Sequence, residues 1–224
     1  SHMLFSKQLT RPTMVLVGFC IACPFLSLLH PPLFNGLLVQ MIEDVQALML
    51  LVIAFFCYFY IRPDRCSEGK KQFWFWAILW WIMLFGRSIS WGRDYFPEVQ
   101  HVYFRIFSIF FIAPVVLMLF SKALRQEILL KFKTVPLPIY SFALALVTLI
   151  IADSIEHSRL IMPIFLYDLA YKDFMEEMYE FPVIWGLFEI TFLLMKQEKL
   201  TMQAGVQTAN NPNTDDLTGF KNVH

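Results

Sequence analysis

Histidines and carboxylates gather at the ends of apolar segments, and these residue types bind metals and move protons. In the run ADSIEHSR, Asp153, Glu156 and His157 stand at i, i+3 and i+4, so they share one face of a continuing helix. A second segment is predicted to start at Pro97, so Glu98, His101 and Arg105, at i, i+3 and i+7, also share a face. Imidazole and carboxylate ligands together suit Zn²⁺, Mn²⁺ or Fe²⁺. The spacing therefore indicates a divalent-metal site.

A third acidic group opens the last apolar segment, in the run KDFMEEMYEF. Glu176 and Glu180 lie on one stripe of a helix, and Glu177 lies at its flank. A bound divalent metal can activate water for attack on an ester, amide or phosphoester, and a neighbouring carboxylate can act as general base. We predict Glu177 and Glu180 as the catalytic carboxylates. The predicted metal ligands are His101, Asp153, Glu156, His157 and Glu176.

Arginines near the same segment ends supply the complementary charge. Arg87, Arg93 and Arg105 are predicted to bind the phosphate or carboxylate of a substrate headgroup, because guanidinium groups pair with such anions in a bidentate way. Together with the acids they suggest a metal-dependent hydrolase that acts on a lipid or on another substrate outside the cytoplasm.

A simpler interpretation of the same residues is a set of salt bridges at helix ends. In that case Arg105 pairs with Glu98 or Glu180, and Arg159 pairs with Asp153. Charged residues near a membrane interface need no further function, so the sequence leaves both interpretations open.

Two further classes of function also stay open. Glu189 lies in a run that otherwise lacks charge, FPVIWGLFEITFLLM, and either carries protons or cations or is bonded to a neighbouring helix. The chain is then a small ion-coupled transporter, or else a non-catalytic assembly subunit whose acidic face docks a partner. The sequence contains no Gly-rich phosphate loop, nucleophile elbow or His-Glu-x-x-His motif that would choose among them.

Composition defines the elements that must hold these residues. The 224 residues are 58% hydrophobic and only 16% charged, with a mean hydropathy of +0.56. A soluble domain carries about 25% charged residues, so this chain is predicted to be a membrane protein. Its formal net charge is zero, which excludes a basic surface for nucleic acid.

Six segments are apolar enough to be predicted as membrane-spanning helices, although the third and fifth are short. The predicted fold is an all-α polytopic bundle. The segments run approximately over Thr13–Leu33, Leu37–Ile61, Gln72–Phe85, Val99–Phe120, Pro136–Ala152 and Phe174–Met195.

Basic residues predict the orientation of the bundle. Under a six-span topology, 13 of the 18 Lys and Arg residues fall on the side of both termini, which is therefore predicted to be cytoplasmic. Residues 1–12 are expected to be a cloning scar followed by a cytoplasmic arm, 13–196 the membrane domain, and 197–224 a polar, disordered cytoplasmic tail. A bacterial inner membrane is the expected location, with membrane lipid, a second copy or a membrane protein as partner.

Overall fold

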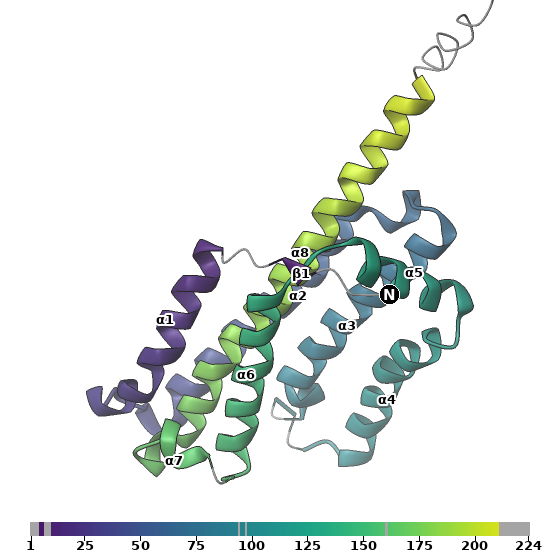
Figure 1. Cartoon of the computed structure of the whole chain (residues 1–224). Coiled ribbons are helices and arrows are strands. Elements are labelled where there is room, and N and C mark those ends of the chain that lie inside the picture. Colours follow the sequence, from purple (N-terminus) through teal and green to yellow (C-terminus); the bar gives the residue numbers. More distant parts are fainter. Residues whose placement is uncertain (1–4, 7–9, 94, 97, 160, 211–224) are drawn as a thin grey trace, which may run out of the picture.

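The computed structural model describes residues 5–6, 10–93, 95–96, 98–159 and 161–210. The chain is almost wholly helical (Figure 1), and the two-residue strands β1 (Phe5–Ser6) and β2 (Leu137–Pro138) pair in parallel. The longer helices are α1 (Arg11–Leu26), α2 (Leu37–Ile61), α3 (Glu68–Ser88), α4 (His101–Met118), α5 (Lys122–Thr134), α6 (Ile139–Glu156) and α8 (Lys172–Asn210). The short helix α7 (Met162–Phe165) and five 3-10 turns (Ser27–Leu29, Phe34–Gly36, Pro63–Arg65, Ser90–Gly92 and Leu169–Tyr171) complete the fold.

Five helical stretches of the described residues are long and apolar enough to cross a membrane. They are Arg11–Leu29, Phe34–Arg65, His101–Met118, Ile139–Glu156 and Leu169–Ala204. The predicted all-α fold is confirmed, and these stretches agree with a multi-pass membrane protein. The sixth predicted segment, Gln72–Phe85, lies in α3. This helix has 21 residues, but its first turn contains the charged residues Glu68, Lys70 and Lys71. The apolar side chains of α4 are largely exposed, as expected of a helix surrounded by lipid.

Local sequence explains where the helices begin and end. Thr10 is the N-cap of α1, and its hydroxyl accepts a hydrogen bond from the Thr13 amide at 3.3 Å. Arg62 ends α2 in the left-handed region, at φ 53°, and Pro63 follows it. The left-handed conformation of Arg62 ends the helix, and a following proline disfavours the α conformation at the residue before it.

Helix α8 is the central element of the bundle. It packs against α1, α2 and α6, whereas α3 packs against α2, α4 and α5. Gly186 lets α8 approach α6 closely, since a Cβ atom there would lie 2.8 Å from both the Ala145 Cβ and the Ser141 carbonyl oxygen. Small residues at helix contacts are the usual means of tight packing in membranes. In Figure 1 the C-terminal part of α8, in yellow, extends beyond the other helices.

Two buried clusters form the core. One surrounds Trp74 and Cys57 and joins α2, α3, α5 and α8. The other surrounds Tyr179 and Met175 and joins α1, α6 and α8. We call the end of the bundle at which α3 and α6 finish and α4 and α8 begin the acidic end, and the opposite end the basic end.

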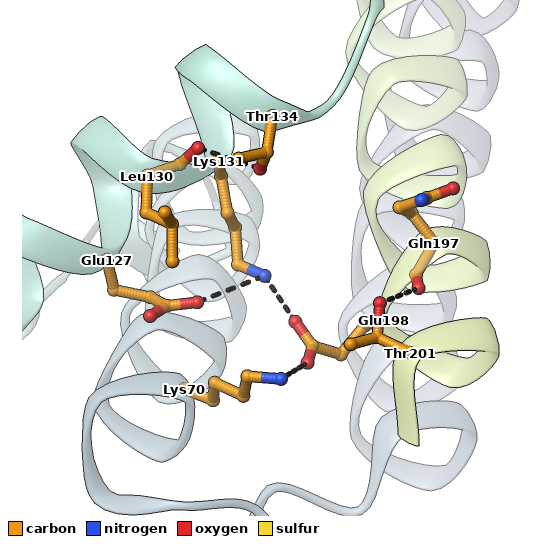
Figure 2. A network of polar contacts seen from close by, with 8 residues as sticks. All are labelled: Lys70, Glu127, Leu130, Lys131, Thr134, Gln197, Glu198 and Thr201. Carbon is orange, nitrogen blue, oxygen red and sulfur yellow. Dashed lines mark hydrogen bonds and ion pairs between the residues drawn. The ribbon is translucent and has the colours of Figure 1, made fainter. Parts of the chain in front are cut away.

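The basic end contains structure that the sequence patterns did not indicate. Residues Lys122–Thr134, which lie between the fourth and fifth predicted spans, form the amphipathic helix α5. Its Lys131 is 7% exposed and pairs with Glu127 at 3.3 Å and with Glu198 of α8 (Figure 2). Lys70 of α3 reaches the other oxygen of Glu198, at 2.6 Å. Residues 197–210 of the predicted tail thus belong to α8, while 211–224 lie outside the described residues.

The charges of this network balance one another. Burial lowers the pKa of the Lys70 ammonium, but the hydrogen bond and the negative charge of Glu198 outweigh this effect, so that pKa is raised. The Lys131 ammonium also lies 4.9 Å from the centre of the Phe73 ring and 5.5 Å from that of Trp74. Ion pairs and cation–π contacts thereby hold α3, α5 and α8 together at the basic end.

Candidate binding cavity at the acidic end

A cavity of about 280 Å³ opens among α2, α3, α6 and α8 at the acidic end. Its polar lining contains five carboxylates from three helices and one guanidinium from a fourth. These side chains are Glu43 of α2, Glu156 of α6, Glu176, Glu177 and Glu180 of α8, and Arg87 of α3. The structure therefore brings together four of the predicted metal-ligating and catalytic acids and one of the three predicted substrate-binding arginines. We call this space the acidic cavity.

The acids lie close enough to act on one another electrostatically. Glu176 is subject to the charges of Glu156 and Glu180, and Glu177 to those of Glu43 and Glu180. Arg87 is the neighbouring positive charge on Glu180. Several carboxylates in one partly buried space repel one another, and a bound cation removes that repulsion.

Packing of α2 on α8 fixes the acids of the cavity. Gln46 is 1% exposed, and its side-chain amide donates to the backbone carbonyl of Glu177 at 2.8 Å. Met175 and Tyr179, on the opposite face of the same turn, are fully buried. This stretch of α8 is anchored on its apolar side, so its glutamates are directed consistently toward the cavity.

The predicted ligands at the end of α6 form a separate group. Asp153, Glu156 and His157 each offer a ligand atom, and these atoms lie within 4.8 Å of one another. However, Arg159 pairs with Asp153 at 3.0 Å, as the salt-bridge interpretation predicted. The His157 Nδ1 lies 3.3 Å from Asp153 and 3.7 Å from Glu156. Only Glu156 of this group also lines the acidic cavity.

His101 occupies a second, basic hollow of about 160 Å³. Arg93 and Arg105 line it too, so the remaining two predicted substrate-binding arginines lie here and not with Arg87. Ser90 lines both the hollow and the acidic cavity, which makes the two spaces neighbours. The hollow lies at the N-terminus of α4, where the helix dipole also favours an anion.

The turn between the two spaces has an unusual backbone. Ser90 and Trp91 adopt left-handed conformations, with φ of 48° and 57°. The Trp91 ring covers Gly86, where a Cβ atom would lie 2.3 Å from it. Only glycine leaves room for the indole at this point, so Gly86 determines where Trp91 lies.

An apolar groove of about 380 Å³ adjoins the acidic cavity along α3 and α8. Leu84 of α3 and Leu187 of α8 line both spaces. The groove continues past Trp80 and Trp76 of α3, and at the basic end it reaches Lys131. A charged cavity and a long apolar groove therefore lie side by side, with Leu84 and Leu187 between them.

Glu189 has a different environment from the cavity acids. It accepts hydrogen bonds from Thr10 at 2.5 Å, from Thr13 at 2.9 Å and from Ser141. Thr10 and Thr13 belong to the start of α1 and Ser141 to the first turn of α6, so two helix N-termini favour its negative charge. The Glu189 carboxylate therefore links α8 to α1 and α6. Of the two roles predicted for Glu189, this contact corresponds to bonding to a neighbouring helix.

Sequence reasoning missed two features of the site. Glu43 was not among the predicted site residues, because nothing in the sequence indicates that α2 faces the stripe on α8. The groove depends on how α3, α5 and α8 are arranged, which hydropathy does not reveal. The spacing of Trp76 and Trp80 along one face of α3 is a signal that could have suggested a lined surface.

The fold and the cavity define a class: an all-helical chain with five described stretches apolar enough to cross a membrane and a carboxylate-rich cavity at one end. Comparison of the chain with protein-family models, with curated proteins and with solved structures gave no match.

Proposed function

We propose that the chain is a metal-dependent membrane hydrolase whose active site is the acidic cavity. The observation that carries this proposal is the convergence of carboxylates from three helices beside Arg87 in one cavity. Glu156 and Glu176 are the proposed metal ligands. The predicted ligands His101 and His157 are not among the described residues that line the cavity. A site made of oxygen ligands alone suits Mn²⁺ better than Zn²⁺.

The cavity residues have distinct proposed roles. Glu156 and Glu176 would hold a divalent cation, which would supply a coordinated water of lowered pKa and stabilise charge on an ester or phosphoester. Glu180 or Glu177 takes the proton from the attacking water, and Arg87 binds the anionic group of the substrate. Arg93 and Arg105, beyond Ser90, attract the same anionic group toward the cavity.

The proposal includes a topology. We propose that α3 also crosses the membrane, so that six spans place both termini in the cytoplasm of a bacterium and the acidic end outside its inner membrane. The excess of Lys and Arg near the basic end supports this orientation. Substrates then reach the acidic cavity from the outer leaflet or from the periplasm.

Hydrolysis by protein in detergent, with Mn²⁺ or EDTA present, tests the proposal. Ester, phosphoester and amide lipids are the substrates to compare. We expect hydrolysis that depends on Mn²⁺ and falls at least about 100-fold in Glu180→Gln, since general-base catalysis contributes roughly 10²–10⁴-fold. Glu98→Gln is the matched control, because Glu98 is exposed and outside the cavity. Equal rates in the two variants, or no hydrolysis of any substrate by the wild type, would contradict the proposal.

A further inference from the structure

The length of the apolar groove matches the depth of one membrane leaflet. On α3 its lining runs from Phe73 to Leu84, which at 1.5 Å per residue is a length of about 16 Å. Half of a hydrocarbon core about 30 Å thick is about 15 Å. The groove is thus as long as one leaflet is deep.

The chemistry of the groove changes along its length. Its walls are aromatic and aliphatic almost throughout, with Trp76, Trp80 and Trp81 on one side and Leu187 and Ile190 on the other. Toward the acidic end, Leu84 and Leu187 line both the groove and the cavity. At the basic end Lys131 lines it, but the Lys131 ammonium is engaged by Glu127 and Glu198 (Figure 2). A molecule bound in the groove would therefore contact apolar walls along its length, and charged side chains would be available to it at the acidic end, among the described residues.

From this arrangement we infer that the site binds a phospholipid of the outer leaflet, with one acyl chain in the groove and its phosphate beside Arg87. The anionic headgroup is complementary to Arg87 and to the neighbouring basic hollow of Arg93, His101 and Arg105. The inference rests on the proposed function, because five carboxylates would repel a phosphate unless a cation in the cavity offsets their charge. It names the substrate class of the proposed hydrolase.

Photo-crosslinking in dodecyl maltoside micelles tests this inference. The probe is phosphatidylglycerol with a diazirine on one acyl chain, and adducts are located by peptide mass spectrometry. We expect adducts on the groove faces of α3 and α8, near Trp80 and Ile190. The variant Leu187→Trp, which fills the junction between groove and cavity, should lower their yield at least fivefold. Leu146→Trp is the matched control, since Leu146 is 48% exposed on α6 and outside the groove.

Competition on the wild-type protein gives an answer even if Leu187→Trp fails to fold. Unlabelled phosphatidylglycerol should abolish the groove adducts, whereas diacylglycerol and glycerol 3-phosphate should each compete at least tenfold more weakly. If diacylglycerol competes equally well, the phosphate is not recognised and the inference is wrong. If glycerol 3-phosphate competes equally well, the site binds a free phosphate without using an acyl chain, and the inference is also wrong.

Metal content of the same samples separates the two claims. Adducts spread evenly over lipid-facing helices such as α4, in protein that contains Mn²⁺, overturn the lipid inference alone. Mn²⁺ at background after purification with added Mn²⁺ overturns the proposed function, whichever labelling pattern is found.

Discussion

The carboxylates of this chain differ in what holds them, and that difference decides their roles. Glu189 is satisfied by three hydroxyl groups and Asp153 by a guanidinium, so both are explained by structure. Glu176, Glu177 and Glu180 of α8 instead line a cavity together with Glu43 and Glu156, and the positive charge that acts on Glu180 there comes from Arg87. An unbalanced cluster of this kind is where a bound cation is expected.

Glu189→Ala should destabilise the bundle without affecting the cavity. It removes the acceptor of three hydroxyl groups, and side-chain hydrogen bonds within membranes contribute about 0.6 kcal/mol each on average, with a maximum of about 1.7. We expect a loss of about 2 kcal/mol, measured by thermal unfolding in detergent, together with unchanged Mn²⁺ binding. Glu98→Ala should unfold like the wild type. Flux of protons or cations in proteoliposomes that is lost in Glu189→Gln would instead support the transporter hypothesis.

The buried network at the basic end makes a prediction about paired charges. Glu198→Leu leaves Lys131 buried with Glu127 as its remaining partner in the network of Figure 2, and should cost about 3 kcal/mol, as is typical when one partner of a buried pair is removed. Replacing both residues, with Lys131→Met added, should recover part of this loss. Urea or thermal unfolding of Glu198→Leu, of Lys131→Met and of the double variant measures the difference. Losses that simply add would show that Lys131 and Glu198 are not coupled.

At the scale of elements, helices α6 and α8 approach each other closely at Gly186. Gly186→Ala places a methyl group 2.8 Å from the Ser141 carbonyl oxygen, which is backbone and cannot rotate away. Overpacking of this kind costs about 1–3 kcal/mol. Gly18→Ala in α1 is the matched control, because nothing lies within 4 Å of its Cβ position. It should be neutral or slightly stabilising, and a similar loss in both variants would contradict the packing argument.

Hydropathy predicted the main helices well because the apolar character of a stretch of about 20 residues is a local property of the sequence. The predicted segment Leu37–Ile61 coincides with α2. Hydropathy did not predict α5, because its apolar residues are interrupted by charged ones, and it did not predict that α8 extends to Asn210. Both depend on contacts between distant residues, of which Lys131 with Glu198 is the clearest.

Prediction of the site residues has the same limit: positions along one helix can be predicted from spacing, but contacts between helices cannot. Spacing along one helix correctly grouped Asp153 with His157 and Glu176 with Glu180. It could not show which helix ends face the same space. His101 accordingly lies in the basic hollow and not in the acidic cavity.

For the whole molecule, the proposed orientation can be tested directly in cells. In a chain whose native cysteines are replaced by serine, Glu98→Cys should react with a membrane-impermeant maleimide in intact cells. Lys122→Cys at the start of α5 should react only after permeabilisation. Both native residues are exposed, so accessibility to the reagent depends on sidedness alone. The reverse labelling pattern would place the acidic cavity in the cytoplasm.

The central claim is that the acidic cavity binds a divalent cation, and the metal content of purified protein tests it most directly. Plasma mass spectrometry should find close to one Mn²⁺ per chain in wild type and in Glu98→Gln after purification with added Mn²⁺. The double variant Glu176→Gln/Glu180→Gln should lose at least nine-tenths of it while unfolding at a similar temperature. Metal at background in the wild type, or equal metal in all three proteins, would contradict the account.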